Sequence, residues 1–275
     1  MAINFKTARD YVYANGQLWE RALFAYLFQN GSLERLHQTL AAYKNPDGGF
    51  GHALEHDVRC PNSHPLALEF LVGMLTTLDI PAGTLLDGAA AWVEANRAAD
   101  GSLVNPPEVL DYPHAPWWDH GGQTSPDSIV GCLIKLGKAN DAVRASTTHW
   151  VRENLNADKI RENEWLFMAY HAYDYHGAVN MGGDLWSVTV ANIIACAQKA
   201  RPDQFYEILR FAPTPHSPIA QAMPSDLLKK MLNHLAEGQQ ADGSWHDEHS
   251  LPQWYPYVTI QVLQGLRRYG YEIGV

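Results

Sequence analysis

The chain has 275 residues, of which 46% are hydrophobic and 18% charged, and its formal net charge at pH 7 is −10. This length and composition allow a large buried core and exclude an intrinsically disordered protein. The negative charge, without any run of basic residues, excludes a nucleic-acid-binding surface. Three cysteines, far apart and without a C-x-x-C pair, argue against a disulfide framework and favour the reducing cytoplasm.

Neither a signal peptide nor a membrane span is expected. Charged residues such as Arg9 and Glu20 interrupt residues 1–31, which therefore lack the apolar centre of a signal peptide. The longest apolar stretches, residues 66–78 and 188–197, are shorter than the roughly 20 residues that cross a bilayer. We therefore expect a cytoplasmic protein without an integral membrane segment.

A repeated turn organises the chain. In residues 40–51, 93–104 and 235–246 an apolar residue is followed four positions later by a polar residue and eight positions later by a glycine. An aspartate precedes each glycine, and an apolar residue stands two positions after it. Asp-Gly favours a tight turn, because Asp bonds its own backbone and Gly tolerates positive φ. Each repeat therefore predicts a helix that ends in a turn.

Helices are predicted along the rest of the chain. Ser63-His64-Pro65 and Ser125-Pro126-Asp127 are typical of helix starts. The largely apolar segments 165–177, 184–200 and 257–270 are typical of buried helices, and strand signals are scarce. We expect an all-α chain of about ten to twelve helices in successive hairpins. Closed into a ring, these hairpins form an α/α toroid, a single domain over residues 1–275.

The third turn carries a family resemblance. Gln239 to Trp245 has the spacing Q-x-x-x-G-x-W, which resembles the QW repeat of squalene and hopene cyclases. The earlier copies replace Gln by Lys44 and Arg97, and Trp by apolar residues. Most of the chain is similar to the terpenoid cyclase and protein prenyltransferase superfamily, especially to its short bacterial prenyltransferase-like proteins. The resemblance implies an α/α toroid in which the repeats have a structural role.

The resemblance does not settle the chemistry. The Asp-x-Asp-Asp acid of class II cyclases does not occur in this sequence, nor do the Asp-rich motifs that bind magnesium and diphosphate. Asp57 and Cys60 have the wrong spacing for the zinc ligands of protein prenyltransferases. Fold alone therefore does not assign an activity.

A group of ionisable residues follows the first turn. Glu55, His56 and Asp57 could provide a buried, neutral carboxylic acid for protonating a substrate, tuned by its neighbours. Asp57 is the first candidate for that acid. The alternative is that Glu55 and Asp57 only form ion pairs with Arg59 and order the loop; as a site residue, Arg59 is assigned to substrate binding.

Metal binding is a weaker hypothesis for the same stretch. His52, His56 and Cys60 are spaced four residues apart, as ligands on one helix face would be. However, Gly51 and Pro61 argue against a regular helix there, and the many histidines make chance clusters frequent. We therefore predict neither a metal site nor a cofactor.

Two aromatic segments are candidates for substrate binding. The connection 100–128 is long and rich in Pro and Gly, as functional loops often are. Its aromatic and polar candidates, together with those that follow the third turn, are Trp117, Trp118, Asp119, His114, Trp254 and Tyr255. The alternative is that these aromatic residues only pack against helix ends. The cluster around His171 and Asp174 is a weaker candidate, because its side chains fall on different helix faces.

Three functions stay open at this stage. The first is an enzyme in which Asp57 protonates an apolar, isoprenoid-type substrate inside an aromatic cavity. The second is a carbohydrate-active protein with Glu55 or Asp57 opposite Asp111 or Asp119. The third is a toroid that serves as a scaffold or binds a ligand without catalysis. We expect an enzyme whose partner is a small apolar molecule or an oligosaccharide, and the oligomeric state is left open.

Overall fold

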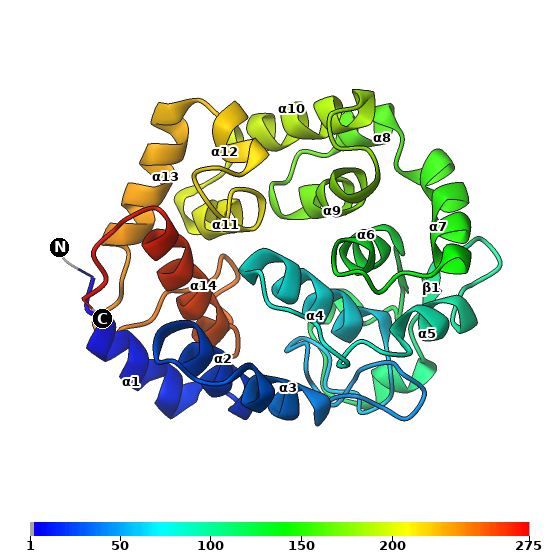
Figure 1. The fold of residues 1–275 in the computed structure, drawn as a ribbon, viewed down its shortest axis with the longest axis horizontal. Coiled ribbons are helices and arrows are strands. Elements are labelled where there is room, and N and C mark those ends of the chain that lie inside the picture. The colour runs from blue at the N-terminus through cyan, green and yellow to red at the C-terminus, as the bar shows by residue number, and fades with distance from the viewer. Residues whose placement is uncertain (1–2, 275) are drawn as a thin grey trace. The chain divides into compact units, whose positions relative to one another are not determined.

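The computed structural model describes residues 3–274, and this range is almost entirely helical (Figure 1). It contains 14 α-helices, four short 3-10 helices and two strands of two residues each. The prediction of an all-α chain is confirmed, with more helices than expected because several are short. None of the helices in the described range is long and apolar enough to cross a membrane.

The described chain forms two compact units. Unit 1 holds the residues up to Leu40, then Glu164–Phe167, and finally the residues from Ile193 onward. Unit 2 holds Ala41–Asn163 and Met168–Asn192. Each unit is described by itself below. The single domain over residues 1–275 stays a prediction.

Unit 1 is built from helices of both chain ends. Its elements are α1 (Phe5–Asn15), α2 (Leu18–Phe28), α3 (Leu33–Ala41), η4 (Pro202–Glu207), α11 (Ile208–Phe211), α12 (Pro218–Ala222), α13 (Ser225–Glu237) and α14 (Tyr255–Arg268). Helix α14 packs against α1, α2, α11 and α13 and is buried along most of its length. The apolar segment predicted at 257–270 is therefore a buried helix, as expected.

Unit 2 contains the middle of the chain. Its elements are α4 (Pro65–Leu78), α5 (Ala89–Ala95), β1 (Leu103–Val104), η1 (Pro107–Asp111), η2 (Pro116–Trp118), β2 (Gln123–Thr124), α6 (Asp127–Lys135), α7 (Asp141–Asn154), α8 (Ala157–Glu162) and α9 (Tyr170–Val179). Helices η3 (Phe167–Ala169) and α10 (Asp184–Lys199) contain residues of both units, as does α3 through its last residue, Ala41. Helix α6 packs against α4 and along the length of α9 (Figure 1).

The three repeated turns have the predicted conformation. Gly48, Gly101 and Gly243 have φ values of 90°, 85° and 97°, which an L side chain rarely adopts. In each turn the preceding Asp accepts a hydrogen bond from the backbone N–H two residues later, at 2.9 to 3.0 Å. The Asp-Gly pair therefore closes the turn in the way that the sequence indicates.

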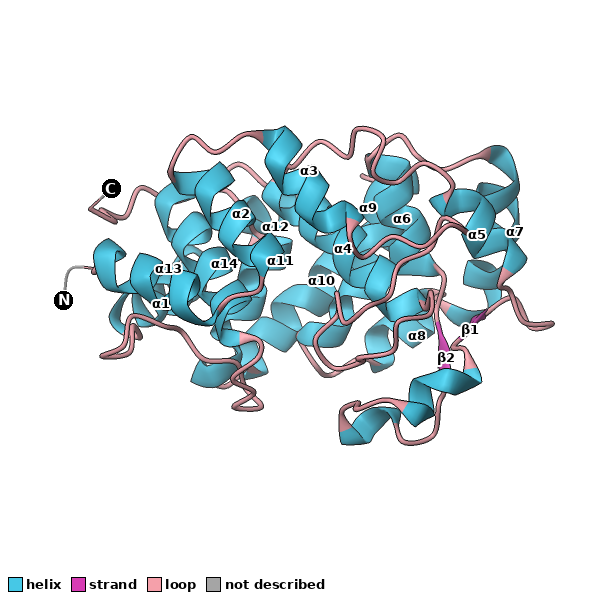
Figure 2. Ribbon diagram, turned by 90° about the horizontal axis from the view of Figure 1, so that it is seen from below, coloured by secondary structure: helices cyan, strands magenta, loops and turns pink. Residues whose placement is uncertain are grey.

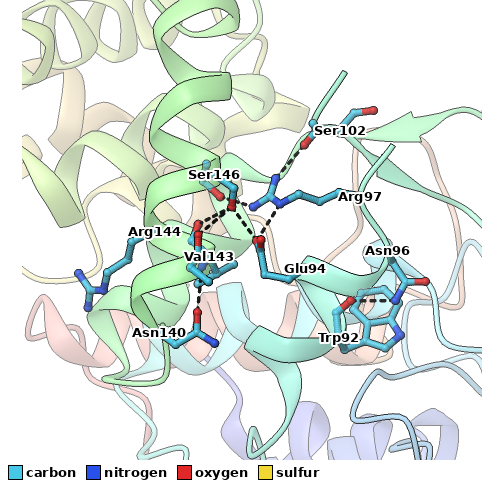
Figure 3. A network of polar contacts seen from close by, with 12 residues as sticks. Trp92, Glu94, Asn96, Arg97, Ser102, Asn140, Val143, Arg144 and Ser146 are labelled. Carbon is cyan, nitrogen blue, oxygen red and sulfur yellow. Dashed lines mark hydrogen bonds and ion pairs between the residues drawn. The ribbon is translucent and has the colours of Figure 1, made fainter. Parts of the chain in front are cut away.

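The polar residue that begins each turn reaches a neighbouring helix. Lys44 donates to the backbone O of Asp87, before α5, at 2.7 Å. Arg97 donates to Thr147 of α7 at 2.6 Å and also binds Glu94, which accepts from Ser146 of α7 (Figure 3). These side chains join successive helices within unit 2.

Gln239 has the same role in unit 1. Its amide accepts from the backbone N–H of Asn4 at 2.7 Å and donates to the backbone O of Asn4 at 2.9 Å. Asn4 is the N-cap of α1, so the amide joins the third turn to the start of that helix. Trp245, at the end of the motif, donates from its indole to Leu235 O at 2.7 Å and closes the turn against α13.

We expect Gln239→Ala to lower the free energy of unfolding of unit 1 by about 2 kcal/mol, because two hydrogen bonds between distant segments are lost. Urea unfolding followed by circular dichroism measures the change. Gln240→Ala is the matched control, because the side-chain amide of Gln240 donates to the nearby Gly238 O within the same turn. Equal stability of the two variants would contradict the role of the amide.

The helix start predicted at Ser63-His64-Pro65 is confirmed: α4 begins at Pro65, and its N-cap is His64, whose Nδ1 accepts from Ala67 N–H at 3.3 Å. A second helix start differs from its predicted position. The helix expected over 165–177 begins as the short η3 and becomes α-helical only at Tyr170. Apolar periodicity indicates that a helix exists but predicts its ends poorly, because the ends depend on which nearby side chains cap the backbone.

The only two strands in the described range carry a long excursion, residues 105–122. Leu103 pairs with Thr124 and Val104 with Gln123, antiparallel. The excursion holds η1 and η2 and extends away from the neighbouring helices of unit 2 (Figure 2). The sequence indicated a functional connection here but gave no sign of the strand pair.

Candidate functional site

The residues after the first turn form a compact loop, residues 51–64, named here the acid loop. His52 and Ala53 have positive φ values of 58° and 63°, which turn the chain back on itself. His52 N–H then donates to Cys60 O at 2.9 Å. This loop is not a helix, so His52, His56 and Cys60 do not lie on one helix face. Among residues 3–274 no group of three or more His, Cys, Asp or Glu side chains is arranged to hold a metal ion.

Glu55 is the perturbed carboxyl of the acid loop. Burial raises its pKa well above the usual range, and the negative charges of Asp57 and Glu69 raise it further. Backbone hydrogen bonds from Asp57 and Val58 oppose this shift, and the first of them measures 2.9 Å. Glu55 is therefore the carboxyl of the acid loop with a strongly raised pKa, caused first by its burial.

The other residues predicted in this loop differ in their burial and in their contacts. Asp57 contributes the nearby charge that raises the pKa of Glu55. His56 is buried, with its ring centre 6.5 Å from that of Phe70 on α4. Arg59 is exposed, and its backbone N–H donates to the excursion.

The structure brings the acid loop and the excursion together. Residues 57–59 pair with residues 113–115, with Val58 opposite His114 in an antiparallel bridge. Two backbone hydrogen bonds of 3.0 and 2.8 Å flank this bridge. Two segments that are separated by some fifty residues, and that were singled out independently in the sequence, therefore form one surface of unit 2.

The predicted excursion residues have distinct environments. Trp118 is partly buried and packs on a small core of Val58, Cys60, Leu66 and Val109. The neighbouring Trp117 is 47% exposed. His114 contacts Asp119 at 3.2 Å, which closes the end of the excursion. Trp118 therefore packs against the core, whereas Trp117 exposes an aromatic face.

A second set of polar groups lies on three helices of unit 2 and is named here the acid–base network: Glu69, Tyr170, His171 and Asp127. Tyr170 OH donates to Glu69 Oε2 at 3.1 Å, between α9 and α4. The rings of Tyr170 and His171 stack at 4.1 Å. His171 Nδ1 bonds Asp127 Oδ1 of α6 at 2.8 Å. A buried carboxylate thus fixes the orientation of a histidine, which is how many general bases are positioned.

Further contacts hold α6 and α9 in register. Ser128 Oγ donates to Asp174 Oδ2 at 3.1 Å, and Lys135 lies 3.5 Å from the other oxygen of the same carboxylate. Gly131 lies directly against the backbone of Asp174, where a Cβ atom would collide with it. The close helix contact is the reason why Asp127 and His171 can meet.

The acid loop and the acid–base network are electrostatically coupled. Glu69 is one of the charges that raise the pKa of Glu55, and Glu69 itself accepts from Tyr170. Contacts run from Glu69 through Tyr170 and His171 to Asp127, and Glu55 is linked to them only through the charge of Glu69. Unit 2 thus holds a carboxyl with a raised pKa and a histidine whose tautomer is fixed by a buried carboxylate.

Sequence reasoning missed most of this network. It did not select Glu69, Tyr170 or Asp127, and it ranked His171 low. One signal was present: Glu69 is the only charged residue in the apolar helix 65–78, and an isolated buried carboxylate needs a polar partner. The pairing of Asp127 with His171 joins two helices and cannot be read from local patterns.

Trp254 and Tyr255 belong to unit 1, whereas the acid loop belongs to unit 2. The ring of Trp254 lies 6.3 Å from that of Tyr257. Tyr255 stacks on His246 at 3.9 Å, nearly parallel. Both residues are placed by packing around the start of α14, and their role in substrate binding stays a prediction.

Unit 1 has a perturbed carboxyl of its own. Burial raises the pKa of Glu207 to about 7, and the charges of Glu248 and Asp247 add to the shift. A hydrogen bond with Tyr206 and the charge of Arg210 act in the opposite direction. Glu207 is therefore poised to change its protonation near neutral pH.

Comparison with protein-family models and with curated proteins gave no match to this chain. Its function must therefore be inferred from its own residues. The most complete arrangement of chemically competent groups is the coupled acid loop and acid–base network of unit 2.

Proposed function

We propose that the chain is an acid–base enzyme whose reaction centre lies in unit 2. The observation that carries this proposal is the Asp127–His171 pair of 2.8 Å, held in the same unit as Glu55, a carboxyl with a raised pKa. Pairs of titratable groups whose environments push their pKa values apart are typical of acid–base catalysis.

Each group has a distinct role in this proposal. Glu55 donates its proton to an oxygen of the substrate as the bond to that oxygen breaks. His171, oriented by Asp127, accepts a proton from the attacking water through its Nε2 atom, since Nδ1 is engaged by the carboxylate. Tyr170 and Glu69 support the ring of His171 by stacking and hydrogen bonding. Asp127 is a positioning residue, since it acts through His171.

The substrate class that fits best is a glycoside. The acid is not isolated among apolar groups, because the charges of Asp57 and Glu69 both act on Glu55. A raised-pKa acid with a second proton-accepting group is what hydrolysis of a glycosidic bond requires. The exposed ring of Trp117, on the excursion that pairs with the acid loop, supplies a face for a sugar.

A second candidate is acid catalysis on an isoprenoid-type substrate. It is favoured by the exposed apolar side chains of the excursion, namely Leu110, Tyr112 and Trp117. It also agrees with the resemblance to terpenoid cyclase-like proteins, which carries the proposal of an α/α toroid. The hydrogen-bonded turns around Lys44, Arg97 and Gln239 support that architecture, because they join successive helices within each unit.

The test is turnover on a panel of nitrophenyl glycosides, oligosaccharides and isoprenoid alcohols. His171→Gln is expected to lower kcat by about 10²- to 10⁴-fold on the substrate that the native protein uses. His149→Gln, at an exposed position on α7, is the matched control and should leave kcat unchanged. Equal turnover by both variants would exclude His171 as the base. A panel without any turnover would leave the non-catalytic, ligand-binding toroid as the better hypothesis.

A further inference from the structure

Large hydrophobic side chains are exposed along the excursion, residues 105–122. Leu110, Tyr112 and Trp117 are 45%, 40% and 47% exposed, and Val104, at the foot of the excursion, is 44% exposed. Single exposed hydrophobic residues are common on protein surfaces, but a group of them marks a site of interaction. Four such side chains within residues 104–117 therefore indicate that this surface binds a partner.

The excursion is held in a defined conformation before any partner binds. At its foot β1 pairs with β2, and Asn105 Nδ2 donates to Gly121 O at 2.8 Å. Farther along, residues 113–115 pair with the acid loop, and Trp118 packs on a small core. The excursion nevertheless extends away from the neighbouring helices of unit 2 (Figure 2), so its outer side is accessible. An accessible surface that is already ordered loses little conformational entropy on binding.

The charged side chains of the excursion are all acidic. Glu108, Asp111 and Asp119 are exposed, and the sequence contains no lysine or arginine between Arg97 and Lys135. Asp119 contacts a histidine of the excursion at 3.2 Å. Glu108 and Asp111 form no ion pair within the part of the chain that the structure describes. Their negative charges are therefore available to a partner.

Acidic and apolar side chains share one side of η1. Val109 is fully buried and belongs to the small core beneath the excursion. Its neighbours Glu108, Leu110 and Asp111 are all exposed. The outer side of this short helix thus presents an apolar side chain between two carboxylates.

Charge and apolar content together specify the partner. A second copy of the chain would bring the same acidic excursion and a net charge of −10, so it would be repelled. Nucleic acids and anionic lipid surfaces are repelled for the same reason. A polypeptide in which Lys or Arg alternates with apolar side chains is complementary in both respects. Its cations can also lie on the aromatic faces of Tyr112 and Trp117.

We propose that the excursion is a docking surface for a basic, partly apolar segment of a partner protein. The carboxylates attract the segment, and the exposed apolar side chains supply the contact area. The exposed Arg59 marks the border of the surface on the side of the acid loop, because its charge repels a basic partner and its backbone N–H joins the excursion. This inference is independent of the proposed acid–base reaction.

Titration calorimetry of the full chain with a synthetic peptide that repeats Lys-Leu-Lys-Phe tests the surface. The native protein is expected to bind this peptide and not the peptide in which Glu replaces Lys. Glu108→Lys/Asp111→Lys should weaken binding by at least about tenfold, because two attractions become repulsions. Leu110→Ser should weaken binding about fivefold through the loss of apolar contact, with an unchanged dependence on salt.

The matched control is Glu153→Lys/Glu237→Lys, at exposed positions on α7 and α13. It changes the net charge of the chain by the same amount and should bind the peptide as the native protein does. All of these variants should keep the native circular dichroism and Tm, because the substituted side chains are exposed.

Equal weakening by the two double variants would show that the peptide responds only to the net charge of the chain, which overturns the docking surface. Failure of the native protein to bind the Lys peptide, or equal binding of the Lys and Glu peptides, would overturn it as well. A dimer in analytical ultracentrifugation that Leu110→Ser dissociates would identify a second copy as the occupant and overturn the basic partner.

Discussion

Glu55→Gln is expected to lower kcat by a factor of about 10²–10⁴ on the substrate that the native protein turns over. The amide has nearly the shape of the protonated carboxyl but cannot deliver a proton to the leaving oxygen. The loss should be smaller for substrates whose leaving group needs no proton, such as dinitrophenyl glycosides. Steady-state kinetics on a good and a poor leaving group therefore isolates the acid step.

Two controls accompany this variant. Glu108→Gln removes an exposed carboxylate from the excursion and should leave kcat unchanged. Circular dichroism should show that Glu55→Gln is folded, because the neutral amide suits a site that already favours the neutral acid. Equal loss of kcat on both kinds of leaving group would mean that Glu55 positions the substrate and another group supplies the proton.

The same variant has an expected signature in stability against pH. The pKa of Glu55 is raised in the folded protein, so the folded state binds the proton more tightly than the unfolded state. Its stabilising contribution is complete below the unfolded pKa and is lost as pH rises through the folded pKa. Glu55→Gln should therefore gain stability relative to the native protein as pH rises.

The sequence predicted local structure well. Asp-Gly turns depend on residues within one or two positions of each other, so Gly48, Gly101 and Gly243 were found with their conformations. The buried helix α14 followed from a long apolar segment. Gly51 and Pro61 also indicated that the acid loop is not a regular helix, whereas the positive φ of His52 and Ala53 is not indicated by any local pattern for these residue types.

The residues of the candidate site were predicted only in part. Glu55 and Trp117 stood out because charged and aromatic residues were concentrated in short, Pro- and Gly-rich segments. The Asp127–His171 contact depends on Gly131, which lets α6 approach the backbone of α9. A glycine inside a helix has many uses, and nothing in one sequence tells which neighbour it admits. Tertiary contacts of this kind decide which polar residues become a site.

The second large expected effect is a pH dependence of the stability of unit 1, and it comes from Glu207. Its folded pKa is about 7, against an ordinary value of 4.5. The unfolded state releases the proton at lower pH, so the native protein loses stability between about pH 4.5 and 7 and not beyond. A shift of this size corresponds to on the order of 3 kcal/mol. We expect Glu207→Gln to remove that loss. The free energy of unfolding of the variant minus that of the native protein should therefore be larger at pH 8 than at pH 4.

Urea unfolding of both proteins at pH 4, 6 and 8 gives the stability difference between variant and native protein at each pH. The change of this difference with pH measures the effect of Glu207. This comparison cancels the pH-independent change that the amide makes to the hydrogen bond with Tyr206. Glu237→Gln, at an exposed position at the end of α13, is the matched control and should follow the native pH dependence. Parallel curves for Glu207→Gln and the native protein would mean that Arg210 compensates the charge fully, so that Glu207 ionises in the folded protein as it does in the unfolded chain. Divergence that saturates above pH 7 would instead identify Glu207 as the group that limits the stability of unit 1 at neutral pH.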